Sequence, residues 1–126
     1  MSAETFTQAE LPAVDPEALT RLERFGGPTL LREMIALFLQ IAPGRLDAAR
    51  AAVAAGDVTA AEDALHSLKS SAAQLGAMRL SRLCEQGELL ARDAMVTKIT
   101  ELLAESRAEH LRAAEWLMNE RAARCS

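Results

Sequence analysis

Apolar residues recur along this chain at the spacing of one face of an α-helix, and this periodicity limits its possible folds more than any other feature. The clearest case spans positions 78–92. Its apolar face comprises Leu80, Leu83, Cys84, Gly87, Leu90 and Ala91. Residues three or four positions apart fall on one side of a helix. The chain has 26 alanines, three Phe, one Trp and no Tyr, a composition that favours helices over strands. We therefore predict an all-α domain.

Turn and capping residues divide this pattern into separate helices. Asp15 and Pro16 are typical of a helix start, because Asp caps the first amides and Pro suits the first helical position. A Gly pair at 26–27 and a Pro-Gly pair at 43–44 are typical of helix ends. We place the predicted helices at 16–25, 28–42, 45–55, 58–75, 78–92 and 96–121.

The four longer helices form the predicted core of the fold, and the two shorter ones cover it. Short connections between long amphipathic helices favour antiparallel neighbours. We expect an antiparallel up-and-down four-helix bundle over residues 15–121, with one or two short covering helices and a flexible N-terminal arm at residues 1–14. Gly87 is costly inside a helix, so its place on an apolar face predicts a close approach between two helices.

The predicted helix at 28–42 is apolar on more than one side. The residues that we expect in the core are Leu30, Met34, Leu37, Phe38 and Ile41. Leu31, Ile35 and Leu39 are apolar as well, although they fall outside that face. Such a helix is either buried on two sides or shows an apolar patch to a partner. We expect the second set to contribute a docking surface.

Charge and hydropathy exclude several classes of function. The 14 basic and 18 acidic residues give a net charge of −4. Proteins that bind nucleic acids usually carry an excess of positive charge, so this function is not expected. No apolar run approaches the ~18 residues of a membrane span, and the polar, acidic start does not resemble a signal peptide. Cys84 and Cys125 lie far apart and are expected to be free thiols. These features predict a cytoplasmic protein without nucleic-acid or membrane partners.

His66 is the main candidate for a functional residue in this sequence. The signatures of nucleotide-binding loops are absent, and the His and Cys residues lack the spacing of metal ligands. On a helix at about 100° per residue, the apolar residues of the segment 58–75 fall on one side, and His66 points away from them. A packing role in the core is therefore disfavoured. Exposure alone still fits a surface histidine without a function.

The neighbours of His66 suit a histidine that accepts a phosphoryl group. Lys69 lies on the same side of the helix and can neutralise an anion on the ring. Ser70 and Ala73 are small, so a partner protein can approach the imidazole closely. A neutral imidazole is a nucleophile.

A longer motif gives a more specific indication. The stretch from His66 to Ala77 reads HSLKSSAAQLGA, and Leu80 and Cys84 follow it. This stretch resembles the signature of histidine-containing phosphotransfer (HPt) domains, which runs H-x-L-K-G-x-x-x-x-L-G-A-x-x-L-x-x-x-C. The resemblance extends over residues 14–93, and the last helix matches only in kind.

The resemblance implies a four-helix bundle that carries phosphoryl groups between aspartates of receiver domains in two-component phosphorelays. It places the phosphoacceptor at His66 and the helper cation at Lys69. Ser70 stands where the family usually has glycine, but serine is small and its hydroxyl can hydrogen-bond a phosphoryl oxygen. The implied partners are response-regulator receiver domains and hybrid sensor histidine kinases. No ATPase activity, metal or cofactor is implied for this chain, and Mg²⁺ is expected in the receiver.

Further residues are candidates for positions near the site. Counting outward from the turn after the His66 helix places Gln86 and Glu88 level with His66 on the next helix. Arg92 lies further along and is either a second cation for the phosphoryl group or a solvated arginine at a helix end. Gln74 either hydrogen-bonds near the site or caps the end of its helix.

Two other functions stay open. A module that had kept the bundle and lost the chemistry would dock on a receiver or an enzyme, although the intact pair of His66 and Lys69 argues against it. The phosphoacceptor hairpin of a sensor kinase would require a following ATP-binding α/β domain, and this chain is too short and too helical for one. We expect His110 to be a half-buried packing residue without a phosphoryl role.

Overall fold

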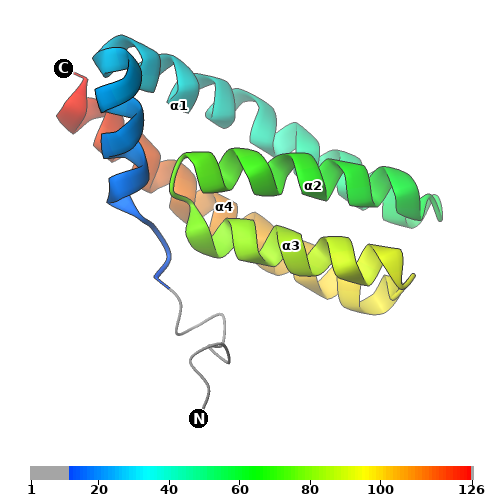
Figure 1. The fold of residues 1–126 in the computed structure, drawn as a ribbon. Helices are drawn as coiled ribbons and strands as arrows, with labels where there is room; N and C mark the ends of the chain where they lie inside the picture. Colours follow the sequence, from blue (N-terminus) through cyan, green and yellow to red (C-terminus); the bar gives the residue numbers. More distant parts are fainter. Residues whose placement is uncertain (1–11, 126) are drawn as a thin grey trace.

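The computed structural model describes residues 12–125, and within them it contains four helices and no strand. The helices are α1 (Pro16–Ala54), α2 (Val58–Gln74), α3 (Met78–Arg92) and α4 (Val96–Arg124). Figure 1 shows them side by side as a bundle, with the first part of α1 turned across one end. The predicted all-α bundle is confirmed, and this first part of α1 is its short covering helix.

α1 is a single kinked helix where we predicted three helices. The predicted break at 26–27 is present, because Gly27 adopts a non-helical conformation with φ 77° and ψ 179°. The predicted break at 43–44 is wrong. Pro43 removes one amide donor, but the helix continues because Phe38, Ala42 and Leu46 stay on one buried face across the proline. Burial along this face outweighs the local preference for a helix end.

The buried face of α1 also differs from the predicted one. Leu31 and Ile35 are fully buried, so the prediction that they contribute to a docking surface is wrong, and of the three residues only Leu39 is partly exposed. Leu37, which we expected in the core, is 56 % exposed. The reason is that apolar residues stand in adjacent pairs, such as Leu30 and Leu31, which produce two overlapping stripes. The spacing within one helix does not distinguish between them.

α2, α3 and α4 approach one another closely around Gly87. A Cβ atom at Gly87 would lie 2.8 Å from Cδ1 of Leu65 on α2 and 3.0 Å from Cδ2 of Leu102 on α4. Both distances are shorter than an ordinary van der Waals contact between carbon atoms. The predicted close helix approach at this glycine is therefore confirmed.

The turn between α2 and α3 is fixed by the segment that precedes α1. The amide of Asp15 donates a hydrogen bond of 2.8 Å to the carbonyl oxygen of Gly76, and the amide of Arg79 donates one of 3.2 Å to that of Ala13. Gly76 has φ +77°, and a Cβ atom there would collide with the carbonyl oxygen of Asp15. Glycine is required at this position both by the left-handed conformation and by the close backbone contact.

The expected arm at residues 1–14 lies mostly outside the described residues, which begin at Pro12. Cys84 and Cys125 are free thiols, as expected, and Cys84 is buried. Within residues 12–125, no helix has both the length and the apolar character that crossing a membrane requires.

His110 on α4 belongs to the core and not to an exposed face. Its ring packs against Phe38 of α1 with the ring centroids 6.1 Å apart, and its side chain is almost fully buried. Nδ1 of His110 has no hydrogen-bond partner among the described residues. Burial lowers the pKa of His110, and the positive charge of Arg107 lowers it further. The folded chain therefore resists protonation of this ring.

This burial predicts that stability depends on pH. In the unfolded chain His110 takes up a proton at about pH 6.5, whereas the folded chain binds it only at lower pH. The free energy of unfolding should therefore decrease as the pH falls below about 6.5. We expect His110→Leu to reduce this dependence, as measured by urea denaturation at several pH values. An unchanged pH dependence in the variant would contradict the prediction.

Candidate functional site

His66 lies on the outer face of α2, as its position on the helix predicts. Its side chain is 62 % exposed. The residues of α2 that face the core are Ala61, Ala64, Leu65, Leu68 and Ala72. α2 begins at Val58, where the side chain of Asp57 accepts a hydrogen bond from the amide of Ala60, and it extends to Gln74. His66 therefore stands near the middle of a regular helix, and a protein partner can reach its ring.

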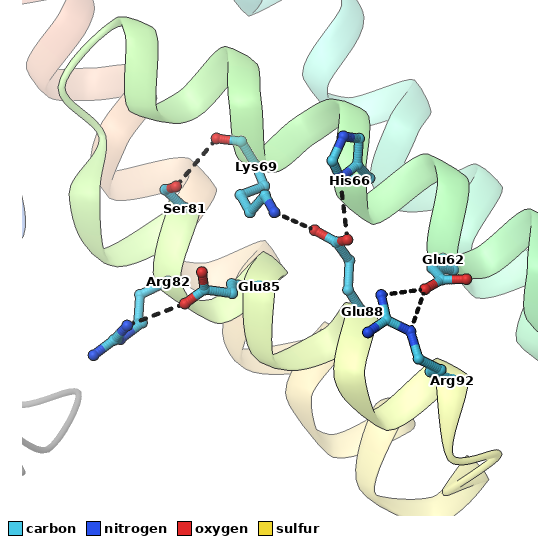
Figure 2. Close-up of polar contacts among 8 residues, drawn as sticks. All are labelled: Glu62, His66, Lys69, Ser81, Arg82, Glu85, Glu88 and Arg92. Atoms are coloured by element: carbon cyan, nitrogen blue, oxygen red, sulfur yellow. Dashed lines mark hydrogen bonds and ion pairs between the residues drawn. The ribbon is translucent and has the colours of Figure 1, made fainter.

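A carboxylate from α3 connects His66 and Lys69. Oε2 of Glu88 lies 3.1 Å from Nδ1 of His66, and Oε1 of Glu88 lies 2.9 Å from Nζ of Lys69 (Figure 2). The Glu88 side chain is only 8 % exposed. A single buried carboxylate thus holds both residues that sequence analysis selected, one with each oxygen.

The two partners of Glu88 keep it charged. Burial by itself would raise the pKa of Glu88, but the hydrogen bonds from Lys69 and His66 outweigh this effect and hold its pKa below the usual value. The thiol of Cys84 lies within the influence of the same charge. Burial raises the pKa of Cys84 to about 12, and the negative charge of Glu88 adds to this shift. Cys84 is therefore a protonated, unreactive core residue, while Glu88 is an anion.

The contact with Glu88 determines which ring nitrogen of His66 is free. An ionised carboxylate only accepts hydrogen bonds, so Nδ1 must carry the hydrogen that lies between them. In a neutral ring the lone pair then belongs to Nε2. This is the nitrogen on the side of the ring away from Glu88, which makes it the atom available for nucleophilic attack.

The other candidate residues lie around this group. Ser70, Ala73 and Gln74 are exposed on α2 between His66 and the end of the helix, and the side chains of Ser70 and Ala73 are small. Arg92 is held by Glu62 of α2, with 2.6 Å between Nη2 and Oε2. The structure thus brings His66 and Lys69 together through Glu88. Arg92 is not part of this group: it pairs with Glu62, one helical turn beyond Glu88 along the interface between α2 and α3.

Glu88 is the member of this group of side chains to which sequence analysis gave no role. Counting from the turn had already placed it level with His66. Its burial could not be read from its own helix, because Glu88 lies at the border of the apolar face of α3, where charged residues are usually solvated. The signal that would have identified it is the combination of two cationic or imidazole side chains on α2 with one acid at the same level on α3.

Within residues 12–125, no group of three or more His, Cys, Asp or Glu side chains is placed to hold a metal ion. The groups that the site offers for chemistry are an imidazole with a defined tautomer, a lysine and a buried carboxylate. This set can attack an electrophile and neutralise charge on it.

Comparisons with known proteins bear on the family and the fold of the chain. A family model described as "Hpt domain" matches residues 33–116. Among solved structures, the chain is similar to histidine-containing phosphotransfer protein B (HptB) from Pseudomonas aeruginosa PAO1. The TM-score is 0.84 and the identity 24 %, and the match covers 89 % of this chain and 96 % of that one. At this identity the second comparison supports the fold alone. No curated protein matches the chain in sequence.

The role of Glu88 can be tested directly on the ring of His66. We expect the neutral ring of His66 in the wild-type protein to show the tautomer with hydrogen on Nδ1 in ¹⁵N NMR spectra. Glu88→Leu removes the acceptor, so the hydrogen should move largely to Nε2, the tautomer that free imidazoles of histidine prefer. Glu85→Leu is the matched control, because Glu85 is an exposed acid one turn earlier that pairs with Arg82. Identical spectra for the wild type and Glu88→Leu would show that Glu88 does not set the tautomer.

Proposed function

The chain belongs to the Hpt domain family, and on this basis we propose that it is a phosphocarrier whose phosphoacceptor is His66. Hpt domains interact with receiver domains of two-component systems. In the proposed reaction His66 accepts a phosphoryl group from a receiver aspartate and passes it to the aspartate of another receiver. The observation that carries the proposal is the contact of Nδ1 with Glu88, because it leaves Nε2 as the nucleophile on an exposed ring.

The proposed step is an in-line displacement at phosphorus. Nε2 of His66 attacks the aspartyl phosphate, the new P–N bond forms, and the P–O bond to the aspartate breaks. The aspartate leaves as a carboxylate, and the imidazole becomes positively charged while Nδ1 keeps its hydrogen. Glu88 stabilises this positive charge across 3.1 Å. The reverse reaction uses the same contacts and returns a neutral ring.

Lys69 supplies positive charge for the phosphoryl oxygens in this proposal. Nζ of Lys69 is 2.9 Å from Glu88, and its side chain is 26 % exposed, so it stays in contact with solvent. A lysine is a flexible point charge that can serve two acceptors with its three donors. Ser70 has a small exposed side chain one turn after His66, and its hydroxyl is a further donor for a phosphoryl oxygen.

We propose a docking surface for the receiver on α1 and α2, between the level of His66 and the C-terminal end of α2. The flank of α1 that carries Leu46 and Arg50 borders α4 across a groove, so the opposite flank faces α2. That opposite flank carries Leu37, together with the half-buried Met34 and Ile41. α1 and α2 run antiparallel and are joined at residues 55–57, so Leu37 and Ile41 lie level with the last turns of α2. Two exposed side chains of α2 near this level, Ser70 and Ala73, are small. One face of a receiver could therefore contact the apolar residues of this surface and place its aspartate at His66.

We propose that this chain neither binds nor hydrolyses ATP and that Mg²⁺ stays in the acidic site of the receiver. Such a relay operates in the cytoplasm, where receivers and the catalytic parts of sensor kinases are located. Incubation with ATP and Mg²⁺ alone should therefore give no phosphorylated protein.

The first test compares the two histidines. His66→Gln should abolish labelling by a phosphorylated receiver, because the amide has no nucleophilic nitrogen. The chain should stay folded, but the free energy of unfolding should fall by about 1–3 kcal/mol, because the buried carboxylate of Glu88 loses its hydrogen bond from Nδ1. His110→Gln should keep labelling at His66. The product should be stable in base and labile in acid, as a phosphoramidate is.

Lys69→Ala provides a graded comparison in the same assay. It should slow transfer without eliminating it, because the lysine assists the reaction and does not attack phosphorus. Full labelling of His66→Gln, or loss of labelling only in His110→Gln, would overturn the assignment. Binding of a receiver without any transfer would instead indicate a docking module.

The second test concerns the docking surface. Leu37→Glu should weaken binding of a receiver that phosphorylates the wild-type chain by about tenfold or more, because a charge would be buried in the interface. Leu111→Glu is the matched control, since Leu111 is an exposed leucine on α4. Both variants should unfold at similar urea concentrations. Equal receiver affinities for the two variants, measured by calorimetry, would place the docking surface elsewhere.

A further inference from the structure

Two cations flank His66, and each is bound to a carboxylate in this structure. On one side Lys69 contacts Glu88 at 2.9 Å, and on the other Arg92 contacts Glu62 at 2.6 Å. Glu62 lies one helical turn before His66 on α2, and Arg92 lies one turn after Glu88 on α3. In Figure 2 the Arg92 side chain extends from α3 toward α2 on the same face as His66.

The two ion pairs differ in how easily they separate. Glu88 is buried, and it also holds Nδ1 of His66, so releasing Lys69 would leave a buried carboxylate with one partner fewer. Arg92 is 59 % exposed, and an ion pair at such a site contributes little because water and salt replace it readily. Separating Arg92 from Glu62 therefore requires less free energy than separating Lys69 from Glu88. A dianionic phosphoryl group on the ring can for this reason pair with Arg92 more readily than with Lys69.

We infer that Glu62 is a positioning residue of the phosphotransfer reaction: it holds Arg92 beside the site in the unphosphorylated chain and gives it up to the phosphoryl group once His66 is phosphorylated. This inference rests on the proposed function. The planar guanidinium matches a phosphoryl group with two parallel hydrogen bonds, which a single carboxylate oxygen of Glu62 does not provide. Glu62 thereby competes with the phosphoryl group and limits how strongly the phosphorylated state is stabilised.

The inference can be tested without knowing the partner receiver. Phosphoramidate phosphorylates exposed histidines: its P–N bond breaks, a bond from phosphorus to Nε2 forms, and ammonia leaves. The second ionisation of the phosphoryl group on His66 is then followed by ³¹P NMR as a function of pH. A guanidinium that contacts the phosphoryl group favours its dianion and so lowers its pKa. This readout reports charge at the phosphoryl group and is insensitive to a purely structural role.

Four variants separate the possible effects. Arg92→Gln should raise the proton affinity of the phosphoryl group. Glu62→Gln should lower it about two- to fivefold, which corresponds to removing the competition of an exposed ion pair. Asp63→Asn is the matched control, because Asp63 is the neighbouring exposed acid on α2, and its effect should be much smaller. In the double variant Glu62→Gln, Arg92→Gln, the effect of Glu62→Gln should disappear.

The outcomes distinguish this inference from the function on which it rests. A phosphoryl group that titrates alike in the wild type and Arg92→Gln would overturn the inference while leaving His66 as the phosphoacceptor. The inference would also be overturned if Glu62→Gln changed the pKa of the phosphoryl group by the same amount with and without Arg92. Glu62 would then act on the phosphoryl group by direct repulsion alone. A wild-type chain that accepts no phosphoryl group would contradict both the proposed function and the inference.

Discussion

The carboxylate of Glu88, enclosed between α2 and α3, is the interaction on which the site depends. A buried anion is costly unless its oxygens are occupied, and here one oxygen faces Lys69 and the other faces His66. Because each oxygen has a separate partner, the same group keeps the lysine near the ring and fixes the hydrogen on Nδ1. Position and chemical state of the imidazole are therefore set by one contact.

That contact requires the two helices to approach closely at one level. Gly87 directly precedes Glu88, and Leu65 directly precedes His66. A Cβ atom at Gly87 would press on Leu65, with 2.8 Å between the two carbon atoms. The missing side chain thus allows α3 to approach α2 at the level where Glu88 meets His66. A glycine that weakens its own helix is in this way part of the construction of the site.

Much of the fold could be predicted from the sequence, because α2 and α3 each carry one clear apolar stripe and are followed by short turns. The start of α4 was predicted as well, but its end was placed at residue 121, and the helix continues to Arg124. α1 was predicted less well. Its paired apolar residues leave the buried face undetermined, and the continuation through Pro43 depends on packing against other helices. The same limit applies to the site. His66 and Lys69 were identified from one helix and its motif, but the role of Glu88 arises from the depth at which two helices meet.

The ring of His66 is attached to α2, and the contact of Nδ1 with Glu88 leaves Nε2 on the side of the ring away from α3. A donor receiver and an acceptor receiver would both need this side, so they cannot be bound at the same time. A relay through this chain would then follow a double-displacement scheme, in which the first receiver departs before the second one arrives. Its throughput would depend on how quickly each receiver dissociates, and an excess of either unphosphorylated receiver would inhibit the other by occupying the shared side.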